Sequence, residues 1–424
     1  MKPTKQQQEF LDWEFGVFFH FGIRSFFPGH KDWDGQPMSA EVFDPKELDC
    51  EEWVRAAKDA GATYAILTAK HHDGFALWPS EYTEYGVKNT PWKNGKGDVV
   101  AEFVTACRKY GVKVGLYYSP AQWGESAVSF QNAKEYDDYF INQIGELLTG
   151  YGRIDYLWFD SCGSEGHEYD KKRIVDEIFR MQPDILTFCD PEWTPCVRWA
   201  GNEDGYAPLD NPLVVSKADF SELATEEQVL SKASFLPSEC DCKIRSTWFF
   251  DNNEETLKSA DELFGMYEMS VGHGSNFLLN IGPDNRGKLP EADKERLLEL
   301  GKRIEAYKTP VTELMSMEQT GENEYSISIP DERKQMWKVS PNVGLANRIV
   351  LMEDLTEGQT IKSFRLYAYL PTYQRKKLLI YEGRTIGHKL ICPFGAMRGS
   401  RYVLEITEAD GTPRLRDMRA YFVR

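Results

Sequence analysis

Several features that mark common protein classes are missing from this chain of 424 residues. The N-terminal stretch MKPTKQQQEFLDWEFG has no apolar segment like that of a secretory signal peptide, and no run is long and apolar enough to predict a membrane-spanning helix. We therefore expect a cytoplasmic protein, or a secreted one if a leader has been removed. No glycine-rich fingerprint follows the first predicted strand, which argues against a dinucleotide-binding fold.

Positive charge is in short supply. The 50 lysines and arginines are outnumbered by 67 aspartates and glutamates, which gives a formal net charge of -17. Nucleic-acid phosphates and anionic membrane surfaces both require clustered basic residues, so we expect neither as a partner. Solubility is a sufficient explanation of the acidic balance.

Residues that bind metals are also sparse. The eight cysteines match no zinc-binding spacing and read as buried free thiols of a reducing compartment. Of only seven histidines, two are adjacent, His71 and His72. Adjacent residues on a strand point to opposite sides, so this pair is a poor chelate. We expect no metal and no cofactor.

What the chain does have is a regular alternation over its first 310 or so residues. Short apolar runs alternate with amphipathic helical patterns, and about eight such units fit a (β/α)8 TIM-like barrel better than an open doubly wound sheet. The segment 190–245 is irregular. The predicted strands are 15–22, 63–69, 112–120, 154–161, 185–190, 246–250 and 276–283. The predicted helices are 49–62, 98–111, 136–152, 170–184, 255–270 and 291–307.

After about residue 312 the pattern changes to short β-type runs separated by turn signals, which predicts a small antiparallel β-sandwich. The runs are 324–330, 335–341, 347–354, 361–370, 377–383, 401–407 and 418–424. We therefore divide the chain into a barrel domain, 1–312, and a C-terminal β-sandwich, 313–424.

Ionisable and aromatic residues end several of the predicted strands. Functional groups of such a barrel lie at the C-terminal ends of its strands, so these residues are expected to meet at one rim. The residues are His20, His71, His72, Tyr118, Trp158, Asp160 and Trp248.

Asp160 follows the apolar run YLWF, where a carboxylate indicates a nucleophile or a general base more than an N-cap. Glycoside cleavage generally uses two carboxylates, and Glu203 and Glu239 in the irregular middle are candidates for the second. Four tryptophans are candidates for sugar-facing walls or, equally, for core packing. They are Trp33, Trp78, Trp158 and Trp248.

Several segments together resemble the α-L-fucosidases of glycoside hydrolase family 29. The resemblance runs from about residue 14 to residue 310, and its most specific motifs are HHDGF and LWFD, in this order. The β-rich tail fits that family's C-terminal sandwich. The resemblance implies retaining hydrolysis of terminal α-L-fucosyl bonds, with a fucosylated oligosaccharide or glycoconjugate as the substrate.

The resemblance also implies roles for single residues. The aspartate of the family's WFD motif is the nucleophile and corresponds to Asp160, while the family's histidines that bind fucose hydroxyls correspond to His20, His71 and His72. The positions that line its sugar pocket correspond to Tyr118, Trp158 and Trp248. The segment HKDWDG replaces a Glu-Trp pair of many relatives, which leaves the contact near Trp33 open.

The acid/base position varies between branches of the family. The segment RWAGNEDGYA resembles the branch that acts on 1,3- and 1,4-linked fucose in Lewis-type oligosaccharides, whose acid/base corresponds to Glu203; Glu239 is then a pocket residue. Three alternatives stay open: a broad-specificity fucosidase that takes 1,2- or 1,6-linked sugar, a sugar-binding barrel without activity, and a metal-dependent barrel hydrolase.

Overall fold

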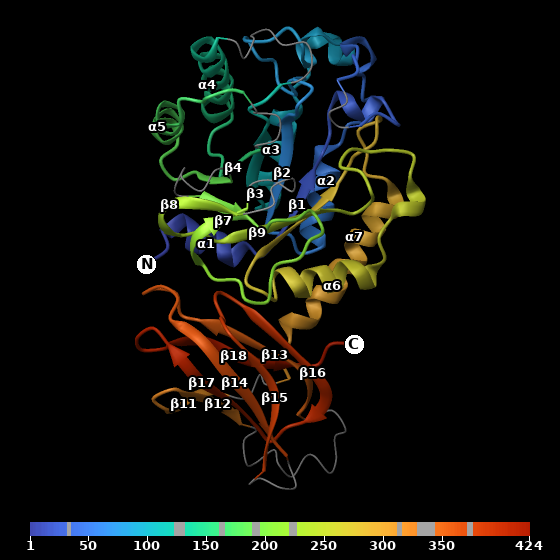
Figure 1. Ribbon diagram of the computed structural model, residues 1–424. Helices are drawn as coiled ribbons and strands as arrows, with labels where there is room; N and C mark the ends of the chain where they lie inside the picture. The colour runs from blue at the N-terminus through green and yellow to red at the C-terminus, as the bar shows by residue number, and fades with distance from the viewer. Residues whose placement is uncertain are drawn as a thin grey trace.

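The computed structural model describes residues 1–31, 35–122, 132–160, 166–188, 196–219, 227–311, 316–328, 344–370 and 376–424. Eight parallel strands close into a barrel in the order β1-β10-β9-β6-β5-β4-β3-β2, with the β-rich C-terminal part below it in the view of Figure 1. The TIM-like fold predicted from the sequence is confirmed. The barrel strands are β1 (Phe15–Phe19), β2 (Tyr64–Lys70), β3 (Lys113–Tyr118), β4 (Tyr156–Phe159), β5 (Leu186–Phe188), β6 (Cys196–Trp199), β9 (Ser238–Lys243) and β10 (Asn276–Ile281).

In the described part of the chain, helices follow six of the eight strands and cover the outside of the barrel. Two residues that bound the predicted helices 49–62 and 98–111 act as caps: the Asp49 side chain accepts from Glu52 N at 2.9 Å, and Gly111 ends its helix in a left-handed conformation with φ 64°. The helices are α2 (Cys50–Asp59), α3 (Val99–Tyr110), α4 (Ala133–Gly150), α5 (Lys171–Met181), α6 (Ala260–Ser270) and α7 (Glu291–Ile304).

One helix that the sequence did not reveal, α1 (Lys5–Trp13), closes the N-terminal end of the barrel. Phe10 and Trp13 pack against the rings of Tyr64 and Tyr156, with centroid distances between 5.4 and 6.2 Å. Gln7 Nε2 donates to backbone carbonyl oxygens at 3.1 and 2.7 Å. Helix α1 therefore covers the end of the barrel where Tyr64 and Tyr156 begin their strands, so we look for a ligand site at the other end.

The segment 190–245 is more regular than the sequence predicts, and this prediction was wrong. It contributes the barrel strands β6 and β9, and between them a two-stranded antiparallel sheet of β7 (Val214–Ala218) and β8 (Gln228–Phe235). The strand predicted at 246–250 is not present, and β9 takes its place earlier in the chain. The helix predicted at 255–270 begins only at Ala260. Short 3-10 turns are Ile23–Phe26, Ala40–Val42, Val87–Asn89, Trp92–Gly95, Glu254–Thr256 and Glu305–Lys308.

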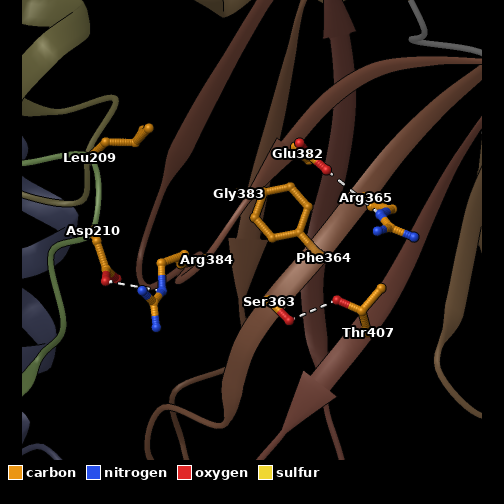
Figure 2. Close-up of a pocket in the computed structure, with 9 residues that line it drawn as sticks. All are labelled: Leu209, Asp210, Ser363, Phe364, Arg365, Glu382, Gly383, Arg384 and Thr407. Carbon is orange, nitrogen blue, oxygen red and sulfur yellow. Dashed lines mark hydrogen bonds and ion pairs between the residues drawn. The ribbon is translucent and has the colours of Figure 1, made fainter.

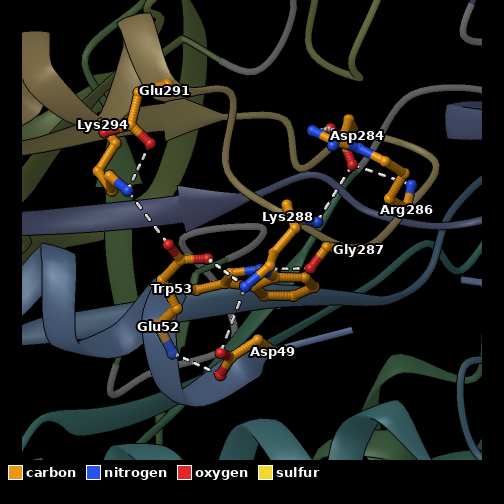
Figure 3. Close-up of polar contacts among 9 residues, drawn as sticks. All are labelled: Asp49, Glu52, Trp53, Asp284, Arg286, Gly287, Lys288, Glu291 and Lys294. Atoms are coloured by element: carbon orange, nitrogen blue, oxygen red, sulfur yellow. Dashed lines mark hydrogen bonds and ion pairs between the residues drawn. The ribbon is translucent and has the colours of Figure 1, made fainter. Parts of the chain in front are cut away.

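The loop between β10 and α7 ties the last strand of the barrel to the first helix after β1 (Figure 3). Trp53 Nε1 of α2 donates to Gly287 O at 3.0 Å. Lys288 Nζ lies 3.5 Å from Asp49 Oδ2 and 3.3 Å from Glu52 Oε2, and Lys294 Nζ lies 3.2 Å from Glu52 Oε1. These contacts join the two ends of the barrel sequence at the rim.

The C-terminal region forms a five-stranded sheet in the order β11-β12-β17-β14-β15 and a three-stranded sheet in the order β16-β13-β18. Strands β11 and β16 were not predicted, and the predicted run 335–341 lies outside the described residues, as does the predicted domain boundary at 312. The strands are β11 (Met317–Gly321), β12 (Glu324–Ser328), β13 (Leu345–Glu353), β14 (Ile361–Tyr369), β15 (Lys377–Gly383), β16 (Leu390–Arg398), β17 (Arg401–Ala409) and β18 (Leu415–Tyr421).

A cleft of about 450 Å³ lies where the loop at Leu209 and Asp210 meets the five-stranded sheet (Figure 2). Its charged groups are already paired: Arg384 Nε lies 3.3 Å from Asp210 Oδ2, and Arg365 Nε lies 3.6 Å from Glu382 Oε2. The cleft is lined from the C-terminal sheet and the 209–210 loop, and none of the predicted site residues that the structure describes lines it.

Candidate active site

A column of four rings crosses the open end of the barrel. The ring of Phe188 stacks on Trp158 (centroids 4.1 Å apart), Trp158 on Tyr117 (5.3 Å), and Tyr117 on His71 (5.4 Å). Tyr117, Trp158 and Phe188 are register partners on β3, β4 and β5, so the column follows directly from strand pairing. The rings are buried and form one wall of the candidate site.

Asp160 directly follows β4 and lies beside this wall. Tyr117 OH donates to Asp160 Oδ2 at 2.9 Å, and His72 Nε2 lies 3.4 Å from the same oxygen. The side chain of Asp160 keeps 25% of its surface exposed. The carboxylate is therefore oriented by two neighbours but accessible to a ligand, as a nucleophile must be.

His20 follows β1 and stacks on Trp248, with centroids 4.9 Å apart. Asn280 Nδ2 donates to Trp248 O at 2.7 Å, so Asn280 Oδ1, which lies 2.7 Å from His20 Nδ1, accepts the Nδ1–H of His20. Burial lowers the pKa of His20 to about 3, and burial together with His72 lowers the pKa of His71 well below its usual value. Both imidazoles are therefore neutral near pH 7.

Glu239 lies beneath the wall of rings and has no exposed surface. Its carboxylate accepts from Tyr64 OH at 2.6 Å, Tyr156 OH at 3.1 Å and Trp158 Nε1 at 3.0 Å. Burial raises its pKa to about 7, against the opposing effect of the three donors. The prediction of a pocket residue is corrected: Glu239 holds Trp158 from below and does not face the open end.

A lysine and two acidic residues lie together near the ends of β6 and β9. Lys243 Nζ hydrogen-bonds to Glu203 Oε2 and lies 4.6 Å from the centre of the Trp248 ring. Asp241 accepts from Trp199 Nε1 at 2.8 Å. Burial raises the pKa of Asp241 well above its usual value, and the charge of Glu203 adds to this effect. Glu203 thus lies beside Lys243, the last residue of β9.

The structure separates other predicted residues from the site. Tyr118 points to the outer face of β3, where its OH donates to Gln143 Oε1 at 2.6 Å and its ring stacks on Phe140 of α4. The residue at the rim is Tyr117, because neighbours on a strand face opposite ways. Trp78 is buried and donates to Glu146 Oε2 at 2.9 Å. Trp33 lies outside the described residues.

Trp248 lies next to His20, but it is not at the end of a strand as predicted. It lies in an irregular segment five residues after β9. Sequence reasoning missed Asp241 and Lys243, although the alternation Glu239-Cys240-Asp241-Cys242-Lys243 is typical of a strand with one polar face. In the ranges that the structure describes, no three His, Cys, Asp or Glu side chains lie together as a metal site would require. The same ranges contain no helix with the length and apolarity to cross a bilayer.

Comparisons with known proteins agree with this geometry. A family model described as alpha-L-fucosidase matches residues 34–309. Alpha-L-fucosidase 1 of Arabidopsis thaliana is 38% identical over 303 residues, which cover 69% of this chain and 58% of that protein. The chain therefore spans less than two thirds of the length of this relative.

Two solved structures share the fold over the whole chain. A glycoside hydrolase 29 family member from an unknown rumen bacterium is 29% identical, with a TM-score of 0.85 and coverage of 100% of this chain and 77% of that one. A Ruminococcus gnavus GH29 fucosidase, solved in complex with fucose, is 27% identical, with a TM-score of 0.82 and coverage of 100% and 95%. Because the family model matches more than half of this chain, the chain belongs to the alpha-L-fucosidase family, glycoside hydrolase family 29.

Proposed function

We propose that the protein is a retaining exo-glycosidase that hydrolyses terminal α-L-fucosyl linkages. The observation that carries the proposal is the position of Asp160: a partly exposed carboxylate at the strand ends, within 2.9 Å of Tyr117 OH and 3.4 Å of His72 Nε2. The Ruminococcus gnavus relative is described as a complex with fucose. In this protein we expect fucose at the rim beside Asp160, between the ring column and the Glu203 side.

The proposed reaction has two displacements. The carboxylate of Asp160 attacks the anomeric carbon. The bond between this carbon and the glycosidic oxygen breaks, and the leaving oxygen takes the proton of Glu203. Water then attacks the same carbon, gives a proton to Glu203, and releases Asp160 as a carboxylate. Two inversions return the sugar with its original configuration.

The buried imidazoles have a positioning role in this proposal. A neutral imidazole has one N–H donor and one acceptor nitrogen, which suits sugar hydroxyls. His20 and His71 are neutral, and Nδ1 of His71 is buried without a hydrogen-bond partner among the described residues. These groups would hold the ring so that its anomeric carbon faces Asp160. The aromatic wall would receive the methyl group that fucose carries in place of a 6-hydroxyl.

For the linkage, we propose a preference for 1,3- and 1,4-linked fucose in branched, Lewis-type oligosaccharides. The support is the segment around Glu203, whose sequence resembles the branch with that preference, and the place of Glu203 beside Lys243 at the rim. The loop that carries it follows β6, and we expect the leaving group to lie on this side of the rim.

The stereochemical test follows the first product by proton NMR during hydrolysis of an aryl α-L-fucoside. Retention predicts that α-L-fucose forms first and then mutarotates. Initial formation of the β-anomer would contradict the double displacement and the nucleophile role of Asp160.

The linkage test compares kcat/KM for a Lewis-type trisaccharide, 2′-fucosyllactose and an aryl fucoside. A strong preference for the trisaccharide over 2′-fucosyllactose supports the 1,3/1,4 proposal. Equal values on all three would instead indicate a broad-specificity fucosidase. A protein that binds these sugars but releases no fucose from any of them would be a sugar-binding barrel.

A further inference from the structure

Strand β9 directs three ionisable side chains into the barrel, one above the other. Glu239, Asp241 and Lys243 alternate with the buried Cys240 and Cys242. Glu239 is enclosed beneath Trp158, and Asp241 is buried against Trp199. Lys243, at the end of the strand, is the member that reaches the rim, with 22% of its side chain exposed.

The contacts of Lys243 place it between two parts of the site. Its ammonium group hydrogen-bonds to Glu203 and lies over the Trp248 ring, which stacks on His20. Its own backbone is fixed as well, because Lys243 O accepts from Lys258 Nζ at 2.6 Å. A cation with a fixed base and two directed contacts orients its partners more strongly than a lysine in solvent does.

We propose that Lys243 is a positioning residue that holds the Glu203 carboxylate at the rim and sets its charge in the substrate-free protein. The inference rests on the proposed function, because it assigns a role to Lys243 through the acid/base residue of that reaction.

The charges around Lys243 favour this pairing. Asp241 from β9 and His20 from β1 face the same space. Burial raises the pKa of Asp241 well above its usual value, which disfavours its charged form, and burial lowers the pKa of His20 to about 3, so this imidazole is neutral near pH 7. Lys258 contacts the backbone of Lys243, and Asp160 acts on His20 from the other wall. Glu203 is the carboxylate that is hydrogen-bonded to the ammonium group.

The ion pair affects the two half-reactions in opposite directions. A cation beside Glu203 favours the charged carboxylate, which the second step needs as a base, and disfavours the protonated form, which the first step needs as an acid. The pH profile of kcat/KM reports the substrate-free enzyme, which is the state described here, and its alkaline limb follows loss of the acid's proton.

The test is therefore the alkaline limb of kcat/KM in Lys243→Met, measured on the oligosaccharide that the linkage comparison selects. Removal of the cation favours the protonated carboxyl, so the limb is expected to move to higher pH by about one unit. Lys243→Arg keeps the charge and should leave the limb near its wild-type position. Lys217→Met, which removes an exposed lysine on β7, is the matched control and should change nothing.

A fall in activity of Lys243→Met without any movement of the limb would mean that Lys243 only supports the structure, and the inference would be wrong. Thermal unfolding checks that the variant folds, and Lys243→Gln repeats the measurement if it does not. Glu203→Gln separates this failure from a failure of the proposed function. If that variant keeps the wild-type alkaline limb, Glu203 is not the acid, and the role of Lys243 falls with it.

Discussion

The two walls of the barrel rim use different chemistry to hold their functional groups. On the wall formed by β1 to β5, rings stack on rings, and the buried imidazoles His20 and His71 are neutral. On the wall formed by β6 and β9, a lysine and two carboxyl groups face each other and two tryptophans. Stacked rings fix geometry, whereas neighbouring charges set protonation. The first wall thus suits a nucleophile that keeps its charge, and the second suits a group that must gain and lose a proton.

The largest effect is expected from Asp160→Ala on the ring wall. If the ring wall serves to orient this one reacting carboxylate, then removal of the carboxylate should lower kcat on an aryl fucoside by about 10⁴-fold or more, as for other covalent nucleophiles. Asp184→Ala, which removes an aspartate bonded to Gln6 in α1, is the matched control and should leave kcat unchanged. An Asp160→Ala protein with wild-type kcat would show that the ring wall does not hold the nucleophile.

Glu239 connects the two walls, and its removal should change the free energy of unfolding. Glu239→Gln leaves three buried donors with a single acceptor oxygen, which should cost about 1–3 kcal/mol. The cost should also depend on pH. Because burial raises the pKa of Glu239 to about 7, above its value of 4.5 in the unfolded chain, the protonated form adds stability below pH 4.5 that is lost as pH rises through 7.

Denaturant unfolding of wild type and Glu239→Gln between pH 4.5 and 7.5 measures this dependence. The wild type should lose up to about 3 kcal/mol relative to the variant over that range. A constant difference across the range would show that Glu239 is charged throughout, and the β9 wall would then hold a charge beneath the rings.

A pair of neighbouring tyrosines sharpens the description of the ring wall. Tyr117→Phe keeps the stacked ring but removes the hydrogen bond to Asp160, so kcat/KM should fall about 10- to 100-fold with little change in stability. Tyr118→Phe removes a bond to Gln143 on the outer face, so stability should fall by about 1 kcal/mol with little change in rate. The opposite result, a rate effect at Tyr118 alone, would support the assignment made from sequence.

The smallest effect is expected where the barrel closes, in the contacts of Figure 3. Lys288→Ala removes partly exposed contacts to Asp49 and Glu52, so the free energy of unfolding should fall by about 0.2–1 kcal/mol, and less in high salt. Thermal unfolding at two salt concentrations measures it. A change in kcat of more than about twofold would indicate that this loop also positions the rim.

The ring wall could be predicted from sequence better than the charged wall, for a physical reason. β1 to β4 are apolar runs with helices between them, and the sequence identified His20, His71, His72 and Asp160 at their ends. The error at Tyr118 arose because a Tyr-Tyr pair does not reveal which residue faces inward. The register with β4, which places Tyr117 opposite Trp158, decides it.

The charged wall was harder to predict from the sequence because β9 carries polar residues on its inner face. Apolar runs identify strands buried on both faces, and β9 has Glu239, Asp241 and Lys243 on the face that would otherwise be apolar. Its partners come from distant segments, such as the loop with Glu203 and the segment with Trp248. Such long-range pairing leaves no periodic signal in the local sequence.

The bond between Asn280 and His20 has a consequence for which sugars fit. Since His20 donates its Nδ1–H to Asn280 Oδ1, the nitrogen Nε2 of His20 presents a lone pair. A hydroxyl that meets this nitrogen has to offer its hydrogen. A fluorine at the same position of the sugar brings a second electron-rich atom and no hydrogen to donate, so the fluoro analogue should bind poorly even though its shape is nearly that of fucose.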